Sequence, residues 1–265
     1  RCPPDAVPSF PLARGGWRGP WRLVRVSGRP LFPLIYAAPA LAGYPAAKLL
    51  TVLICLATAY QTWRLATALG FERRSLVIPL LFLQPSYLLL SSETMTEPLF
   101  ALVFVSALRL RRANFATAAA LLASLLPLAR PEGFFIVALW AFWMLVARDR
   151  EASLVRRVLA LRTLTVGVVA WWALALAITR DPLWILHNWP HNWSPTEASY
   201  GHGSPFDYLR RSAEILGGWL LAPFVVGLGL LLAKRRATEL TSSLLFILVV
   251  HTILWTFGLF GSAGY

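Results

Sequence analysis

The amino-acid sequence predicts an all-α fold, a multi-pass transmembrane bundle of about eight helices. Hydrophobic residues make up 57% of the 265 residues and charged residues only 14%, which is outside the range of soluble proteins. Apolar runs recur along almost the whole chain. Most could cross all or much of a hydrocarbon core of ~30 Å, which needs ~20 helical residues. Basic residues collect in alternate connections between these runs.

Charged residues and Pro or Gly clusters divide the apolar runs into eight predicted spans. Several are shorter than ~20 residues, which indicates tilt, a broken helix, or burial behind other helices. The expected spans are residues 47–68, 75–92, 97–110, 114–129, 133–147, 158–178, 214–233 and 241–260.

The unequal distribution of basic residues predicts the orientation of the spans. The positive-inside rule makes the more basic set of loops cytoplasmic. Residues 1–46 then form a first extracytoplasmic loop with interfacial helices, unless 31–43 is an additional crossing. Residues 47–265 form a single membrane domain, with a long extracytoplasmic loop at 179–213. The cytoplasmic set is Arg64, Arg73, Arg74, Arg109, Arg111, Arg112, Arg148, Arg150, Arg156, Arg157, Arg162, Lys234, Arg235 and Arg236; the outer set, counted from residue 91 onward, is Arg130, Arg180, Arg210 and Arg211.

Several function classes are disfavoured by composition and motifs. The formal charge of +13 follows from the basic loops of a membrane protein, so we expect no nucleic-acid partner. Cys2 and Cys55 give no disulfide framework. The sequence has no glycine-rich phosphate loop, no His-Glu-x-x-His helix and no Gly-x-Ser-x-Gly elbow. His187 and His191 have no third ligand in the sequence pattern, so we expect no metal site there.

The acidic residues collect on the predicted outer side, so the chemistry is expected there. The predicted cytoplasmic acids lie among arginines, which indicates solvent-exposed ion pairs. The outer acids are Glu93, Glu97, Glu132, Asp181, Glu197, Asp207 and Glu214.

The segment 91–98 (SSETMTEP) places two carboxylates, Glu93 and Glu97, four residues apart beside a helix start. One interpretation is capping, because Pro98 suits a first helical turn and acids favour a helix N-terminus. The other is a catalytic or binding role, because carboxylates at the rim of a membrane core are costly without a partner.

The next outer turn, 129–133 (ARPEG), places Arg130 and Glu132 on either side of a proline. Arg130 could hold a phosphate with two hydrogen bonds. The alternative is an ion pair of Arg130 with Glu132 or Glu97 that locks two loops together.

The long outer loop is rich in Trp, His and Tyr, including His187, Trp189 and His191, and ends near Arg210 and Arg211. These residues form either an aromatic belt at the membrane interface or one wall of a pocket for a sugar or lipid phosphate.

Three motifs in this order resemble the C-type (GT-C) membrane glycosyltransferases: 28–35 (GRPLFPLI), 92–100 (SETMTEPLF) and 129–133 (ARPEG). They are similar to the mannosyl- and arabinosyltransferase group that uses polyprenyl- or dolichyl-phosphate sugars. Asp5 followed by Ala13-Arg14 matches the spacing after the family's first acidic pair, with Ala6 in the second acidic position. The resemblance covers most of residues 5–135.

The resemblance implies an enzyme that moves a sugar from a polyprenyl-phosphate donor to an acceptor hydroxyl with inversion, in the cell membrane. Asp5 would be the general base, and Glu93 and Glu97 further acids or donor-positioning groups. Arg130, or Arg210 with Arg211, would stabilise the leaving phosphate. No cofactor is expected; some relatives use a divalent metal. The family also has a helix before Asp5 and an Arg-Tyr element after Tyr265, so we expect a fragment.

Two other classes stay open. A transporter or flippase would use interrupted spans and intramembrane polar groups such as Gln84, Pro85 and His251. A non-catalytic assembly subunit is consistent with Ala6 in place of the second acid.

Overall fold

The computed structural model describes residues 6–16, 18–25, 29–146, 154–188, 203–235 and 237–257, and the regular elements within them are helices. They are α1 (Ala6–Gly15), η1 (Pro20–Val24), α2 (Leu31–Leu41), α3 (Tyr44–Ala68), η3 (Arg74–Leu76), α4 (Val77–Phe82), α5 (Pro85–Ser91), α6 (Glu97–Arg112), α7 (Ala116–Ala123), α8 (Leu126–Ala129), α9 (Glu132–Val146), α10 (Leu154–Thr179), α11 (Trp184–His187), α12 (Asp207–Arg210), α13 (Ser212–Leu216), η5 (Gly218–Leu220), α14 (Leu221–Ala233) and α15 (Thr238–Phe257). The all-α prediction is confirmed for these residues.

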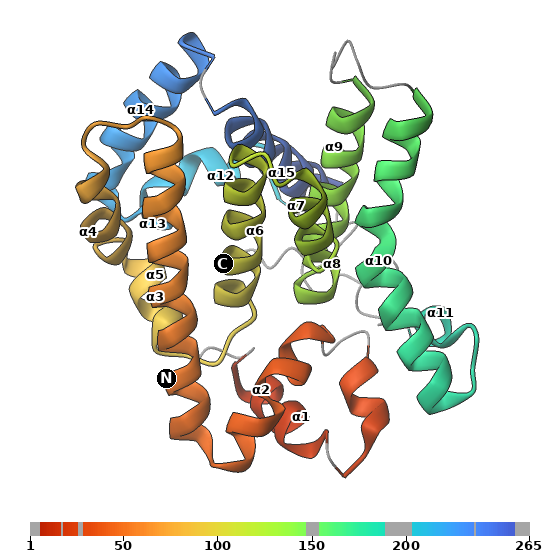
Figure 1. Ribbon diagram of the computed structural model, residues 1–265. Helices are drawn as coiled ribbons and strands as arrows, with labels where there is room; N and C mark the ends of the chain where they lie inside the picture. The colour runs from red at the N-terminus through yellow and green to blue at the C-terminus, as the bar shows by residue number, and fades with distance from the viewer. Residues whose placement is uncertain are drawn as a thin grey trace. The chain divides into compact units, whose positions relative to one another are not determined.

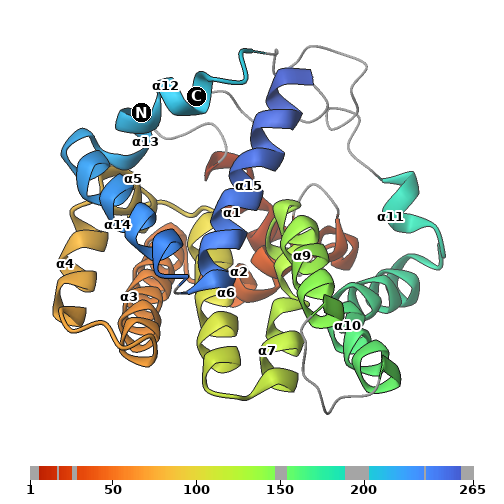
Figure 2. The same cartoon turned by 90° about the horizontal axis from the view of Figure 1, so that it is seen from above.

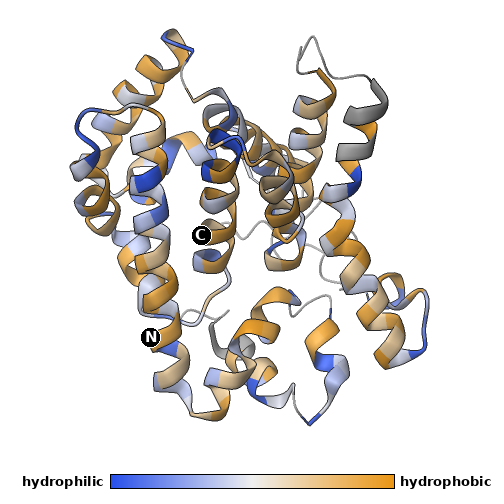
Figure 3. Ribbon diagram, in the orientation of Figure 1, coloured by the Kyte–Doolittle hydropathy of each residue, from blue (hydrophilic) through white to orange (hydrophobic). Residues whose placement is uncertain are grey.

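Three of the described helices are long and apolar enough to cross a membrane: α3, the part of α10 from Leu161 to Thr179, and α15. The bent pair Arg74–Phe82 and Pro85–Ser91 would be a fourth if it forms one span. Figure 3 shows hydrophobic colours along most helices and hydrophilic colours mainly at helix ends and connections. The chain therefore has three or four candidate spans by length and composition, and the predicted eight crossings stay a prediction.

The chain divides into two compact units. The first comprises Arg1–Leu83 and Tyr87–Asn188, and the second comprises Gln84–Ser86 and Trp189–Tyr265. The longer segment of the second unit begins inside the predicted outer loop 179–213.

Helices α3 and α6 form the main packing contact of the first unit. Ala47, Thr51, Cys55 and Ala59 are buried and follow one another at four-residue intervals along α3. Such small residues on one face allow close approach of two helices. Figure 1 shows α3 and α6 running in the same direction, and Figure 2 shows α7 folding back beside α6.

Two predicted spans are interrupted. The expected span 75–92 bends by 72° between Phe82 and Pro85. Proline disfavours helical geometry at the residue before it, which places the break at Gln84. The expected span 114–129 ends its first part at Ala123 and resumes at Leu126.

The segment before α2 is anchored to α10. The indole Nε1 of Trp171 donates to the backbone oxygen of Val24 at 3.0 Å, and Trp184 Nε1 donates to the same oxygen at 3.4 Å. Val24 is fully buried. The first predicted outer loop thus contains three short helical elements, and η1 is held by residues more than 140 positions later.

In the second unit, α12 packs against α15 through polar and aromatic groups. Asp207 Oδ2 accepts from Trp255 Nε1 at 2.9 Å and from the Ser204 backbone N–H at 2.8 Å. The Tyr208 ring meets the His251 ring edge-on, with centroids 6.2 Å apart. The Ser204 hydroxyl in turn accepts from the Phe206 backbone N–H at 3.2 Å, so the residues just before α12 are tied to its first residue.

Candidate functional site

The turn between α8 and α9 places Arg130 beside the start of α6. Arg130 is extended (φ −153°, ψ 149°), as expected for a residue before proline, so α8 ends at Ala129 and α9 begins at Glu132. A Cβ at Gly133 would lie 2.2 Å from the backbone carbon of Leu126. The tight packing of α9 on α8 therefore requires glycine at this position.

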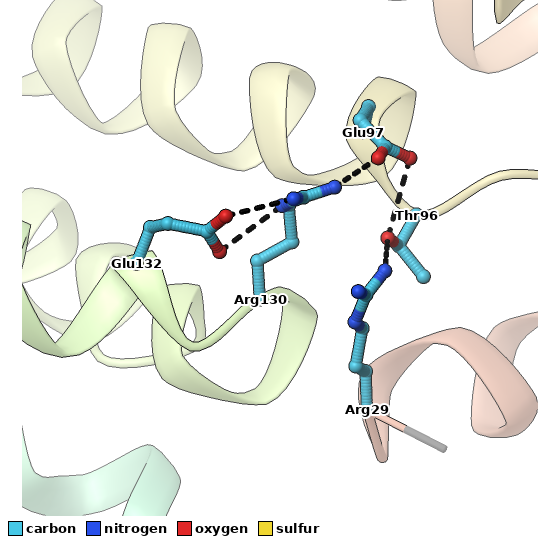
Figure 4. A network of polar contacts seen from close by, with 5 residues as sticks. All are labelled: Arg29, Thr96, Glu97, Arg130 and Glu132. Atoms are coloured by element: carbon cyan, nitrogen blue, oxygen red, sulfur yellow. Dashed lines mark hydrogen bonds and ion pairs between the residues drawn. The ribbon is translucent and has the colours of Figure 1, made fainter. Parts of the chain in front are cut away.

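Arg130 bridges two carboxylates (Figure 4). Its Nε and Nη2 donate to the two oxygens of Glu132, at 3.1 and 2.7 Å. Its Nη1 donates to Glu97 Oε1. Both ion pairs that the sequence offered as the alternative interpretation of Arg130 are thus present. Together they link the α8–α9 turn to the first residue of α6.

Thr96 extends this network to the N-terminal segment (Figure 4). Its hydroxyl donates to Glu97 Oε2 at 3.3 Å and accepts from Nη1 of Arg29. Arg29 has a φ of +52°, in the left-handed region that non-glycine residues rarely adopt. We call Arg29, Thr96, Glu97, Arg130 and Glu132 the arginine–glutamate cluster.

Opposing effects set the pKa of Arg130. Burial by itself lowers it, but the negative charges and hydrogen bonds of Glu132 and Glu97 outweigh burial and raise the pKa above its ordinary value. The side chain of Arg130 is 20% exposed, that of Glu97 25% and that of Glu132 11%. Arg130 therefore stays charged, and its two partners differ in their access to solvent.

Glu93, predicted as catalytic, has partners on α3. Tyr44 Oη donates to its Oε2 at 2.9 Å, and Lys48 Nζ lies 3.4 Å from its Oε1. Lys48 also lies over the Tyr44 ring, 4.9 Å from the centroid. Both oxygens of Glu93 are therefore engaged within the first turns of α3.

Comparisons with protein-family models, with characterised proteins and with solved structures find no match to this chain. The resemblance to the C-type glycosyltransferases stays a prediction from motifs.

His187, predicted to bind substrate, ends α11 and pairs with Asp181. The His187 Nδ1 atom lies 2.9 Å from Asp181 Oδ2. This hydrogen bond, together with one from the Leu183 backbone N–H, lowers the pKa of Asp181 below its ordinary value of 3.8.

The remaining predicted site residues lie elsewhere. Arg210 and Arg211 belong to the second unit, where both are exposed and Arg210 lies 3.9 Å from Asp207. Hydrogen bonds from Trp255 and from the Ser204 backbone, together with these arginines, lower the pKa of Asp207. Asp5, Trp189 and His191 lie outside the described residues.

A metal site would need a denser group of ligands than the structure provides in the residues it describes. Among them, no three His, Cys, Asp or Glu side chains are grouped as a metal ion would require.

Sequence reasoning missed Tyr44 and Lys48 as partners of Glu93, and it missed the contact of Arg29 with Thr96. Lys48 carried a usable signal, because a charged side chain just inside a predicted span needs a partner. Arg29 and Thr96 carried no such signal, since they lie 67 positions apart in the chain.

Proposed function

We propose that this chain is a multi-pass glycosyltransferase of the cell membrane that takes a sugar from a polyprenyl-phosphate donor at the extracytoplasmic face. The observation that carries the proposal is the arginine–glutamate cluster. Two arginines and two glutamates of this cluster meet at the starts of α6 and α9. The positive-inside rule assigns the loops that carry them to one side of the membrane. Such groups suit a phosphorylated, hydroxylated substrate.

The proposal assigns roles by chemistry. A carboxylate takes the proton of the acceptor hydroxyl as that oxygen attacks the anomeric carbon, and the bond from this carbon to the phosphate oxygen breaks with inversion. Asp5, Glu93 and Glu97 are the proposed acidic groups, with Asp5 as the base. Arg130 stabilises the departing phosphate. Glu132 positions Arg130, because it binds the guanidinium with both oxygens.

The donor and acceptor would also contact the aromatic outer loop. His187, Trp189 and His191 are proposed from the sequence as sugar-binding residues, since ligand sites are lined largely by aromatic side chains with a few polar groups. Arg210 and Arg211 are proposed as additional phosphate-binding groups. The lipid-linked donor and the bilayer are the proposed partners. The eight crossings and the outer location of these loops are part of the same proposal.

A transfer assay tests the function. Asp5→Asn, Glu93→Gln and Glu97→Gln are made singly in the intact protein, and sugar transfer from a radiolabelled polyprenyl-phosphate sugar is measured. We expect at least one substitution to reduce transfer about 100-fold or more, the range typical of lost acid–base catalysis. Undiminished transfer in all three would end the catalytic assignment.

A non-catalytic membrane assembly subunit is the second candidate. It is favoured by the pairing of Glu93, Glu97, Arg130 and Glu132 with opposite charges, which a purely structural clamp would also produce. Such a subunit would neither bind the donor nor transfer sugar.

A transporter or flippase is the third candidate. It is favoured by the 72° break before Pro85, since interrupted helices often form transport sites. It would move its substrate across vesicles and leave every acceptor unmodified.

A further inference from the structure

Arg130 holds its two carboxylates unequally. Glu132 takes two guanidinium nitrogens through both of its oxygens, whereas Glu97 takes one nitrogen through one oxygen. Paired parallel hydrogen bonds between arginine and a carboxylate are stronger and more specific in geometry than a single one. Glu97 is therefore the easier of the two to displace.

Solvent access points the same way. The side chain of Glu97 is about twice as exposed as that of Glu132, 25% against 11%. A carboxylate that leaves Arg130 must be resolvated or find another donor. Glu97 would keep one partner after leaving Arg130, because the Thr96 hydroxyl binds its other oxygen at 3.3 Å.

The local charge favours replacing Glu97 by another anion. Glu97 is the first residue of α6 and Glu132 the first residue of α9, so two helix N-termini of more than three turns add positive potential to that of Arg29 and Arg130. A lipid phosphate carries at least one negative charge, so at Nη1 of Arg130 it would supply no less charge than the carboxylate it replaces.

We propose that the phosphate group of a lipid phosphate replaces Glu97 at Nη1 of Arg130, while Glu132 keeps the other side of the guanidinium. Glu97 is then a stand-in anion that occupies the phosphate position when no ligand is bound. This inference rests on the proposed function and adds to it the atom of the chain that receives the phosphate. Glu132 becomes a positioning residue that fixes the guanidinium during the exchange.

The experiment measures ligand affinity and needs no sugar transfer. The protein in phosphatidylcholine nanodiscs is titrated with polyprenyl phosphate, and separately with inorganic phosphate. We expect Glu97→Gln to bind polyprenyl phosphate about tenfold more tightly, a difference of ~1.4 kcal/mol, because the competing anion is gone. Arg130→Gln should bind at least about tenfold more weakly, since charge-assisted hydrogen bonds to the phosphate are lost.

Matched controls separate the exchange from general charge effects. Glu72 is an exposed carboxylate in the connection after α3 and lies outside the arginine–glutamate cluster. Glu72→Gln should leave the affinity unchanged. If Glu97→Gln does not fold, Glu97→Asp replaces it: its side chain is one methylene shorter, withdraws from Nη1 and should also tighten binding.

The outcomes are distinct. Unchanged or weaker binding of both polyprenyl phosphate and inorganic phosphate in the Glu97 variant overturns the exchange, as does undiminished binding in Arg130→Gln. Tightening for inorganic phosphate alone supports the exchange and assigns the site to a free anion. Tightening in the Glu97 variant with no sugar transfer by the unsubstituted protein keeps the exchange and rejects the transferase; transfer by the unsubstituted protein without tightening in the variant does the reverse.

Discussion

Arg130 is the residue on which the geometry of the arginine–glutamate cluster depends. One guanidinium lies between two carboxylates that come from different helices, and the three groups together carry a formal charge of minus one. Removing Arg130 leaves two carboxylates that are only partly exposed and have lost their shared cation. Such a loss costs more than the intact pair contributes to stability.

A double-mutant cycle measures this coupling. Arg130→Gln is expected to lower the free energy of unfolding by about 2–4 kcal/mol, with Glu97→Gln costing less. Because the two side chains are in contact, the double variant should lose less than the sum, with a coupling of ~1–3 kcal/mol. Denaturation in detergent micelles provides the values.

Arg64→Gln serves as the control for this cycle, since Arg64 is exposed and donates to the hydroxyl of Tyr60. It should change stability by less than about 0.5 kcal/mol. Additive effects of Arg130 and Glu97 would mean that their contact contributes nothing.

The pair of Asp181 and His187 predicts a pH effect. The folded pKa of Asp181 lies below 3.8, so the contact stabilises the α11 turn above that pH and the stabilisation is lost as the pH falls through the lowered pKa. His187→Ala should raise the pKa of Asp181 toward its ordinary value. Carboxyl carbon NMR of labelled aspartate measures the shift.

Asp207 is the internal reference in the same spectra, because its partners are Trp255 and Ser204. Its pKa should not change in His187→Ala. An unchanged Asp181 would show that the hydrogen bond from His187 does not set its pKa.

At the residue scale, the sequence indicated which side chains are polar and near helix starts but not which pairs form. The partners of Arg130 were foreseeable because Glu132 is two residues away and Glu97 begins a neighbouring predicted span. The partners of Glu93 come from the start of α3, more than 40 positions earlier, and depend on how the helices pack.

At the scale of the elements, glycine positions decide how closely helices pack. The backbone N–H of Gly167 in α10 donates to Ser124 Oγ at 3.0 Å, and a Cβ at Gly167 would lie 2.1 Å from the Ser124 backbone oxygen. Any side chain there would push α10 away from the end of α7.

Gly167→Ala should therefore destabilise the protein by about 1–3 kcal/mol, the usual cost of overpacking. The matched control is Gly227→Ala in α14, where a new Cβ meets nothing within 4 Å. That change should be neutral or stabilising by up to about 1 kcal/mol, since alanine favours helix. Equal effects at the two positions, measured by thermal unfolding, would contradict the close contact.

Hydrophobic runs predicted the long helices well and the interruptions poorly. The predicted spans 47–68 and 97–110 correspond to α3 and α6 within a few residues. Both breaks were signalled by prolines: Pro85 follows the first, and Pro127 follows the second, where it has no N–H to donate to the Ala123 carbonyl. Ser124 ends α7 by turning its hydroxyl to the Leu121 carbonyl and to Gly167, a contact that arises only from packing.

At the scale of the whole molecule, sidedness is the property that the proposed function requires. The two ends of α6 provide a direct test, because Ser92 before the helix and Ala113 after it are both exposed. We expect Ser92→Cys to react with a membrane-impermeant maleimide from outside intact cells. Ala113→Cys should react only after the membrane is opened.

Both labelling variants are made with Cys2 and Cys55 replaced by Ser, and that cysteine-free chain is the blank. Labelling of Ala113→Cys from outside would reverse the orientation and remove the proposed extracytoplasmic pocket.

Composition could predict a multi-pass helical protein, but the number of crossings could not be read from it. Helices such as α7 and α9 have the apolar composition of a span without its length.

The two indole groups on the Val24 carbonyl bear on how the chain is made. Trp171 and Trp184 follow Val24 by 147 and 160 residues. At a ribosomal rate of roughly 5–20 residues per second, the segment around Val24 waits about 7–30 s after its own synthesis before its anchors exist. During that interval the Val24 carbonyl lacks both indole donors, so η1 can be anchored to α10 only after α10 has been translated.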